Sequence, residues 1–324
     1  MDCPVFCSVF AEEMKAYLDL QVSFGGKERS YLTTLRLFDR FCIEQGIEKL
    51  EFTREHAAIW VTKRDTEATT THYSRVNTSK QFLAYLSKKG YDIFVVRDVK
   101  FKESGFQPHI FTDDEINRYF TVADEFASSH NRKDAIQYPI LFRLLYCCGM
   151  RINETLGVRK RDVDLDTGII KLFETKNDCE RLIVLGADMK CLMRQFADKC
   201  FYLIDDNGYI FTTSNGSRLS GDKIYWVHRE FLRRAGIPFL GDSLGPRVHD
   251  WRHTMAVKSF KQIADIGMDL YVALPILSAY LGHKTIYATE RYVRLTMSIY
   301  PYIEERFGTK VDEVFREAVI YEED

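Results

Sequence analysis

The chain has 324 residues, of which 46% are hydrophobic and 28% charged, and its formal net charge is −2. That length is sufficient for two domains, and that composition is typical of a globular protein rather than a disordered or fibrous one. No apolar run approaches the roughly 18 residues that a membrane helix needs, and the N-terminus does not have the pattern of a signal peptide. Eight cysteines are scattered without a CxxC pair, which favours free thiols in a reducing cytoplasm over disulfides or a zinc site.

Charge is distributed unevenly along the chain. Residues 62–102 hold nine Lys and Arg against four Asp and Glu, and residues 217–261 hold the same numbers. The last 23 residues, 302–324, hold three basic and eight acidic side chains. Two basic regions are typical of a protein that binds a polyanion such as nucleic acid, although solvated helix faces would give the same counts.

The first hundred residues are expected to be helical. Apolar residues recur at helical spacing over 9–60 and, after a threonine-rich turn at 69–71, again over 73–89. The absence of acidic residues between Glu67 and Asp92 favours DNA binding by the 73–89 helix, whereas plain packing would explain its apolar face equally well. Its basic residues, which we expect to contact the DNA backbone, are Arg75, Lys80, Lys88 and Lys89.

A domain boundary is expected near residue 105. The apolar periodicity lapses between about residues 98 and 112, and Gly105 and Pro108 punctuate this segment. Thr112 and Glu115 then have the spacing of a capping box, which predicts the start of a helix. The sequence therefore predicts a helical domain over 1–104 and a second domain over 105–324.

A buried helix is expected to position an arginine in the second domain. The segment from Tyr138 to Gly149 is nearly all apolar, and Arg151 follows it directly. The planar guanidinium of arginine suits phosphate oxygens. A salt bridge between Arg151 and Glu154 is the alternative interpretation.

Strand periodicity replaces helical periodicity over residues 163–185, which predicts a small antiparallel sheet of two or three strands. Lys176 lies at the tip of the predicted hairpin, where a lysine is usually only solvated unless a partner lies beneath it. Helices return over 187–200 and 220–236, and the second of these is basic. The fold class expected is mostly α with a small antiparallel β-sheet, and further candidates for DNA contacts are Lys223 and Arg229.

The densest set of reactive side chains lies between His249 and Tyr292. This stretch also contains Arg252 and His283, so it combines imidazoles, a guanidinium and a phenol. An anionic substrate and a tyrosine that acts on it would account for this combination. The alternatives are a metal pair formed by His249 and His253, a His283 satisfied in the core, and a Tyr292 that only packs.

Four motifs along the chain resemble those of the tyrosine recombinase (phage integrase) family, and the resemblance is strong over 145–295 and weak over 1–100. The most specific is Leu-Gly-His at 281–283 followed by Ile286, Thr289 and Tyr292 at regular spacing. The other motifs are the His-Asp-Trp-Arg box that begins at His249, the first-arginine box around Arg151, and the lysine segment that contains Lys176 and Arg181.

The resemblance implies a two-domain clamp around duplex DNA and a reaction through a covalent intermediate. Tyr292 would attack a scissile phosphate and leave a 3′-phosphotyrosyl link and a free 5′-hydroxyl. Lys176 would protonate the departing 5′-oxygen, and His249 would assist removal of the phenolic proton. Because a phenol has a pKa near 10, it needs such help at neutral pH.

The resemblance also implies which groups bind the phosphate. Arg151 and Arg252 would hold its non-bridging oxygens, and His283 would hydrogen-bond it. Fixed guanidinium groups stabilise the charge that gathers in a phosphodiester transition state. The covalent link conserves the bond energy, so neither a metal nor ATP nor any other cofactor is expected.

The chain departs from the family pattern in two places. Val293 and Arg294 follow the tyrosine, where the family often has a small polar residue and histidine, and we expect little effect from this change. Cys179 occupies a position where related hairpins often carry another lysine, so Lys171 is a minor rival to Lys176.

The expected function is site-specific recombination between two DNA sites, in the service of an integrating mobile element. The expected partners are double-stranded DNA with a specific core site and three further copies of the chain, without a membrane. The acidic helix expected over 302–324 would dock in a neighbouring subunit or fold back on its own domain. The alternatives are DNA relaxation of the type IB topoisomerase kind and a catalytically inactive DNA-binding accessory protein.

Overall fold

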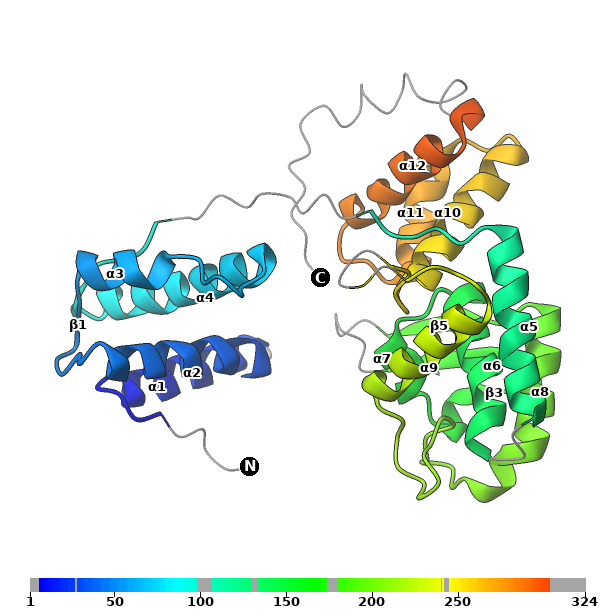
Figure 1. The fold of residues 1–324 in the computed structure, drawn as a ribbon, viewed down its shortest axis with the longest axis horizontal. Helices are drawn as coiled ribbons and strands as arrows, with labels where there is room; N and C mark the ends of the chain where they lie inside the picture. Colours follow the sequence, from blue (N-terminus) through cyan, green and yellow to red (C-terminus); the bar gives the residue numbers. More distant parts are fainter. Residues whose placement is uncertain are drawn as a thin grey trace. The chain divides into compact units, whose positions relative to one another are not determined.

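The computed structural model describes residues 6–26, 28–97, 107–129, 133–173, 180–239, 241 and 245–303. The chain forms two compact units, Met1–Phe106 and Gln107–Asp324. The described residues are mostly helical with small sheets, as the sequence predicted (Figure 1). None of the helices among these residues combines the length and apolarity needed to cross a bilayer.

The first unit is a set of helices around an aromatic core. Phe38 lies at its centre, fully buried, and packs against the rings of Trp60 and Phe82 at centroid distances of 5.1 and 5.8 Å. Its elements are α1 (Ala11–Ser23), α2 (Glu28–Glu44), α3 (Arg54–Val61) and α4 (Thr69–Lys88), with a parallel pair of two-residue strands, β1 (Glu51–Phe52) and β2 (Asp92–Ile93).

Local side-chain contacts explain the start of α3. The Thr53 hydroxyl accepts from the His56 amide and His56 Nδ1 accepts from the Thr53 amide, which closes a capping box at the start of α3. The threonine-rich segment at 69–71, expected as a turn, instead forms the first turn of α4. The prediction was wrong because β-branched residues at a helix N-terminus still adopt helical geometry when the following turns pack.

The second unit carries a small sheet among its helices (Figure 1). The sheet has the order β3–β4–β5, is antiparallel throughout, and pairs Ile170 with Ile183. The elements are α5 (Asp113–Ser129), α6 (Lys133–Cys147), α7 (Ile152–Gly157), η1 (Lys160–Asp162), β3 (Val163–Asp164), β4 (Ile169–Leu172), β5 (Arg181–Val184), α8 (Ala187–Cys200), η2 (Phe201–Leu203), α9 (Gly221–Arg234), α10 (Asp250–Asp265), α11 (Leu270–Leu281) and α12 (Tyr287–Ile299).

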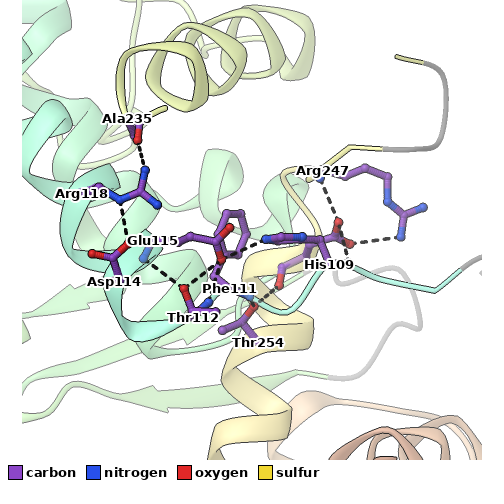
Figure 2. A network of polar contacts seen from close by, with 10 residues as sticks. His109, Phe111, Thr112, Asp114, Glu115, Arg118, Ala235, Arg247 and Thr254 are labelled. Carbon is purple, nitrogen blue, oxygen red and sulfur yellow. Dashed lines mark hydrogen bonds and ion pairs between the residues drawn. The ribbon is translucent and has the colours of Figure 1, made fainter. Parts of the chain in front are cut away.

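The segment that enters the second unit is fastened to α10 (Figure 2). Phe111 stacks on the fully buried Trp251 with ring centroids 3.9 Å apart, and its amide donates to the Thr254 hydroxyl at 3.1 Å. The predicted capping box then starts α5, because the Thr112 amide donates to a Glu115 carboxylate oxygen at 2.8 Å and the Glu115 amide donates back to the Thr112 hydroxyl. The contacts of Phe111 hold this segment against α10, and the first turn of α10 carries site residues.

Candidate active site

The first turn of α10 positions three polar side chains for the site. Helical spacing places Arg252 and His253 one turn after His249, and the rings of the two histidines meet edge to face with centroids 4.7 Å apart. Arg252 is only 1% exposed, because Trp251 and Thr254 on either side anchor this turn in the core. The guanidinium is therefore held by the fold rather than by solvent.

Arg252 connects three separate segments of the unit. Its Nη1 donates to the Gly149 carbonyl at 2.5 Å, and its Nη2 donates to the Leu281 carbonyl at 2.6 Å. The same Nη2 lies 3.0 Å from Nε2 of His283. Burial lowers the pKa of Arg252 to about 10, so this buried guanidinium is still charged at neutral pH and can stabilise an anion.

Arg151 approaches the same place from the end of α6. Gly149 makes the approach possible with a φ of +59°, and a Cβ there would lie 3.0 Å from Met255 Sδ. Arg151 Nη1 pairs with Glu154 at 2.8 Å, which is the alternative contact considered from the sequence. Its Nη2 donates to the Gly282 carbonyl at 3.2 Å, so Arg151 also reaches the segment that Arg252 contacts.

Three arginines thus converge on the C-terminal end of α11. In addition to the contacts of Arg151 and Arg252, Arg181 Nη1 donates to the Tyr280 carbonyl at 2.8 Å. Arg181 Nη2 also pairs with Glu154 at 2.6 Å, so this carboxylate joins two of the three guanidiniums. Burial alone would raise the pKa of Glu154, but Arg181 and Arg151 hold it below its usual value. The last carbonyls of a helix are its negative end and attract cations.

Tyr292 lies on α12 and is 4% exposed. Its hydroxyl is 2.9 Å from Nδ1 of His253, and its ring is nearly parallel to that of His283 at a centroid distance of 6.1 Å. The fully buried Thr289 fixes His283, because its hydroxyl lies 2.6 Å from Nδ1 of that ring. The structure therefore brings Arg151, His249, Arg252, His283 and Tyr292 into one connected site.

Burial keeps two imidazoles of the site uncharged. It lowers the pKa of His253 to about 2 and that of His283 to about 3, and nearby arginines act in the same direction. At neutral pH both rings are neutral, so each has one nitrogen that can accept a hydrogen bond.

Two contacts in the site were missed from the sequence. His253 was considered only as a metal ligand and Thr289 only as a motif position, yet each hydrogen-bonds a predicted site residue. Their partners lie 39 and 6 positions away along the chain. The contact that spans 39 positions forms because α10 packs against α12, which the sequence does not reveal. Lys176 and Cys179 lie outside the described residues, and Lys171 is exposed on β4.

The basic residues of the first unit do not all face solvent. Arg75 is 2% exposed, pairs with Glu67 at 2.7 Å and donates to the Trp60 carbonyl at 2.5 Å. The expectation that Arg75 contacts DNA must therefore be corrected: this guanidinium holds α3 and α4 together. Lys89 pairs with Glu13 at 2.6 Å, Lys80 is half-buried and Lys88 is exposed.

On α9 the two candidate residues differ as well. Lys223 is exposed, whereas Arg229 is half-buried and lies over the Phe239 ring at 4.1 Å. Arg229 Nη1 also donates to the hydroxyl of Tyr225 at 3.3 Å. Lys223 is therefore the freer of the two cations, while Arg229 is partly held by aromatic rings.

A buried tyrosine hydroxyl near clustered guanidiniums suits an enzyme that acts on an anionic ester. The model of the phage integrase family matches residues 109–298, more than half of the chain, and the chain belongs to that family. An integrase/recombinase of Sinorhizobium fredii is 26% identical over 295 residues, which cover 88% of this chain and 93% of the relative. The tyrosine recombinase XerA of Pyrococcus furiosus is 25% identical over 240 residues, covering 67% of this chain and 75% of XerA.

The fold is also similar to that of solved tyrosine recombinases. A lambda integrase tetramer bound to a Holliday junction has a TM-score of 0.64 at 16% identity, with 87% of this chain and 76% of the integrase chain covered. The expectation of a mostly helical fold with a small sheet and a catalytic domain of the tyrosine recombinase type is confirmed.

Proposed function

We propose that Tyr292 is the nucleophile with which this site-specific recombinase cleaves and rejoins DNA. Its phenolic oxygen attacks the scissile phosphorus, a 3′-phosphotyrosyl bond forms, and the bond from phosphorus to the 5′-oxygen breaks. In the reverse step a 5′-hydroxyl of another strand attacks the phosphotyrosine and releases Tyr292. The convergence of Arg151 and Arg252 on the end of α11, beside this phenol, is the observation that carries the proposal.

The two arginines supply electrostatic stabilisation. A guanidinium has five N–H donors, so Arg151 and Arg252 can bind the non-bridging oxygens while each keeps a contact to a backbone carbonyl. Such charge-assisted bonds are stronger where charge gathers in the transition state. His283, which lies 3.0 Å from Arg252 Nη2, hydrogen-bonds the same phosphate in the proposed reaction.

Two further groups complete the proposed reaction. Lys176 protonates the departing 5′-oxygen, and Arg181, five residues later, is tied to Glu154 of the site and supports this assignment. His249, beside His253, assists removal of the phenolic proton.

Recombination between two sites requires four active tyrosines, so we propose a tetramer on DNA with a specific core site. The tetrameric assembly of the lambda integrase neighbour supports this proposal. The first unit would contact the DNA backbone and complete a clamp, and the 302–324 segment, nearly all outside the described residues, would dock in a neighbouring subunit. The integrase/recombinase relative supports a role in the integration of a mobile element.

The reaction is proposed to take place in the cytoplasm. All six cysteines within the described part of the chain are free thiols, which is the state expected in a reducing compartment.

Trapping the covalent intermediate tests the proposed function. The Tyr292→Phe chain is used to select bound fragments from a random duplex pool, and the selected site is built into a nicked duplex that releases the cleaved end. The native chain should form an adduct that survives denaturing electrophoresis, and Tyr292→Phe should form none. Tyr287→Phe, which changes an exposed tyrosine on the same helix, is the matched control and should still form the adduct.

Two rival functions predict different results. A topoisomerase would relax a plasmid that lacks the selected site, and an inactive accessory protein would bind the site without any adduct. Either result would contradict the proposal.

A further inference from the structure

The hydroxyl of the proposed nucleophile already has an imidazole partner. Tyr292 Oη lies 2.9 Å from Nδ1 of His253, and the two side chains are 4% and 6% exposed. The contact joins α12 to the first turn of α10. At this distance the two groups share one hydrogen bond, and the tautomer of the ring decides which of them donates.

The other side of the His253 ring faces a buried carboxylate. Nε2 is 3.9 Å from Oδ1 of Asp250, which is fully buried. The backbone amide of Arg247 donates to Asp250 at 2.9 Å and its Nη2 donates at 3.2 Å, so the carboxylate is held in place (Figure 2). A carboxylate beside Nε2 favours the tautomer with its proton there and leaves the lone pair on Nδ1 free to accept from Tyr292.

The electrostatic surroundings keep the ring neutral, as a group that is to accept a proton must be. Burial lowers the pKa of His253 to about 2, and the cationic and imidazole groups around the ring act in the same direction. A phosphate bound by the arginines adds negative charge near this ring and opposes that effect. The groups that lower the pKa are His249, Arg291, Arg247 and Arg252, and the Asp250 carboxylate lies 3.9 Å from Nε2 of the ring.

We propose that His253 accepts the phenolic proton of Tyr292 during strand cleavage, that His249 assists this transfer through its contact with the His253 ring, and that Asp250 is the positioning residue that orients that ring. The inference rests on the proposed function. In this step the O–H bond of Tyr292 breaks, its proton moves to Nδ1, and the freed electron pair forms the bond to phosphorus. The bond from phosphorus to the 5′-oxygen breaks, and that oxygen leaves with its electron pair and is protonated by the general acid. The resulting imidazolium faces the Asp250 carboxylate.

The test compares His253→Asn with the native chain in single-turnover cleavage of the nicked duplex from about pH 6 to about pH 9.5. The amide oxygen of asparagine lies near the position of Nδ1, so this variant keeps a hydrogen-bond acceptor for Tyr292 but has no base. A second substrate carries sulfur in place of the bridging 5′-oxygen. A thiolate leaves without a proton, because a thiol has a pKa near 8.5.

A second buried histidine supplies the matched control. His228 Nδ1 lies 2.8 Å from the Tyr119 hydroxyl in the core of the second unit, and His228 is 1% exposed. His228→Asn therefore makes the same chemical change in the same kind of contact, away from the phosphate-binding arginines. Urea denaturation of both variants separates a loss of folding from a loss of chemistry.

We expect His253→Asn to slow cleavage of both substrates by about 100-fold or more at neutral pH, the usual contribution of a general base. The ratio of native to variant rates should shrink as the pH approaches the phenol's ordinary pKa near 10, because solvent then removes the proton. His228→Asn should show neither effect.

Three results would overturn the inference. They are a His253→Asn rate close to the native rate, a deficit that does not change with pH, and a deficit that disappears with the sulfur leaving group. The last would place His253 at the leaving group instead of the nucleophile. A native chain that forms no adduct would contradict the proposed function and this inference with it. If the native chain is active, the His253→Asn results test the role of His253 alone.

Discussion

At the scale of single residues, the site depends on how many contacts one guanidinium can make. The sequence allowed two interpretations of Arg151, a phosphate ligand or a partner of Glu154. The structure shows the pair with Glu154, and this pair leaves other donors of the guanidinium for a phosphate. Glu154 uses one edge of the guanidinium, and Nη2 reaches the Gly282 carbonyl. Five donors in a fixed plane allow both contacts.

Arg151→Lys tests whether this planar geometry matters. The charge remains, but lysine cannot hold a carboxylate and a phosphate in one plane, so we expect single-turnover cleavage to fall by about 100- to 1,000-fold, as when one transition-state donor is lost. Arg143→Lys is the control, because Arg143 is equally half-buried and is bidentate to Asp124. Equal losses in the two variants would show that the effect comes from stability alone.

The site residues could be predicted to the extent that spacing along the chain reveals them. Arg151, Arg252 and Tyr292 stand in motifs, and the structure brings them together as those motifs implied. The contact between His253 and Tyr292 could not be predicted, because it spans 39 positions and depends on how α10 packs on α12. The burial of Arg75 could not be predicted either, because it depends on an ion pair with Glu67, which lies in the loop before α4.

At the scale of elements, a helix start with a side-chain cap could be predicted, whereas the uncapped start of α4 could not. Side-chain caps act over three residues, so Thr112 marked the start of α5 correctly. The end of α11 matters most for the site, because its carbonyls receive three arginines. Gly282 makes that end possible with a φ of +68°, and a Cβ there would lie 3.1 Å from Arg181 Nη1.

Gly282→Ala should therefore reduce both stability and activity. A left-handed alanine costs about 1 to 2 kcal/mol, and the new methyl group would also displace Arg181 from the end of α11. Gly46→Ala is the control, because Gly46 has a φ of +65° and an added Cβ would meet nothing within 4 Å. Urea denaturation should show similar losses for the two variants, and only Gly282→Ala should lose cleavage. Unchanged cleavage in Gly282→Ala would show that the arginines do not depend on this cap.

At the scale of the whole molecule, the net charge of −2 gives no indication of the basic residues that we expect to contact DNA. Counting charges along the chain indicated a polyanion but could not say which cations are exposed. Tertiary pairing decides this: Arg75 is buried with Glu67, whereas Lys88 and Lys223 are exposed.

Salt titrations test this assignment. Lys88→Gln and Lys223→Gln should each weaken binding to the selected duplex and reduce the slope of log affinity against log salt by about 1, because each removes one phosphate contact. Arg75→Gln should instead mainly destabilise the first unit, since it leaves Glu67 buried without its partner. An unchanged slope in both lysine variants would place the DNA contacts elsewhere.

Mapping the covalent adduct tests the central claim most directly. The native chain is trapped on the nicked duplex, digested with nuclease and protease, and the peptide that carries a nucleotide is identified by mass spectrometry. We predict a phosphodiester on the Tyr292 oxygen, joined to a 3′-nucleotide. A nucleotide on any other side chain, or an adduct that persists in Tyr292→Phe, would contradict it.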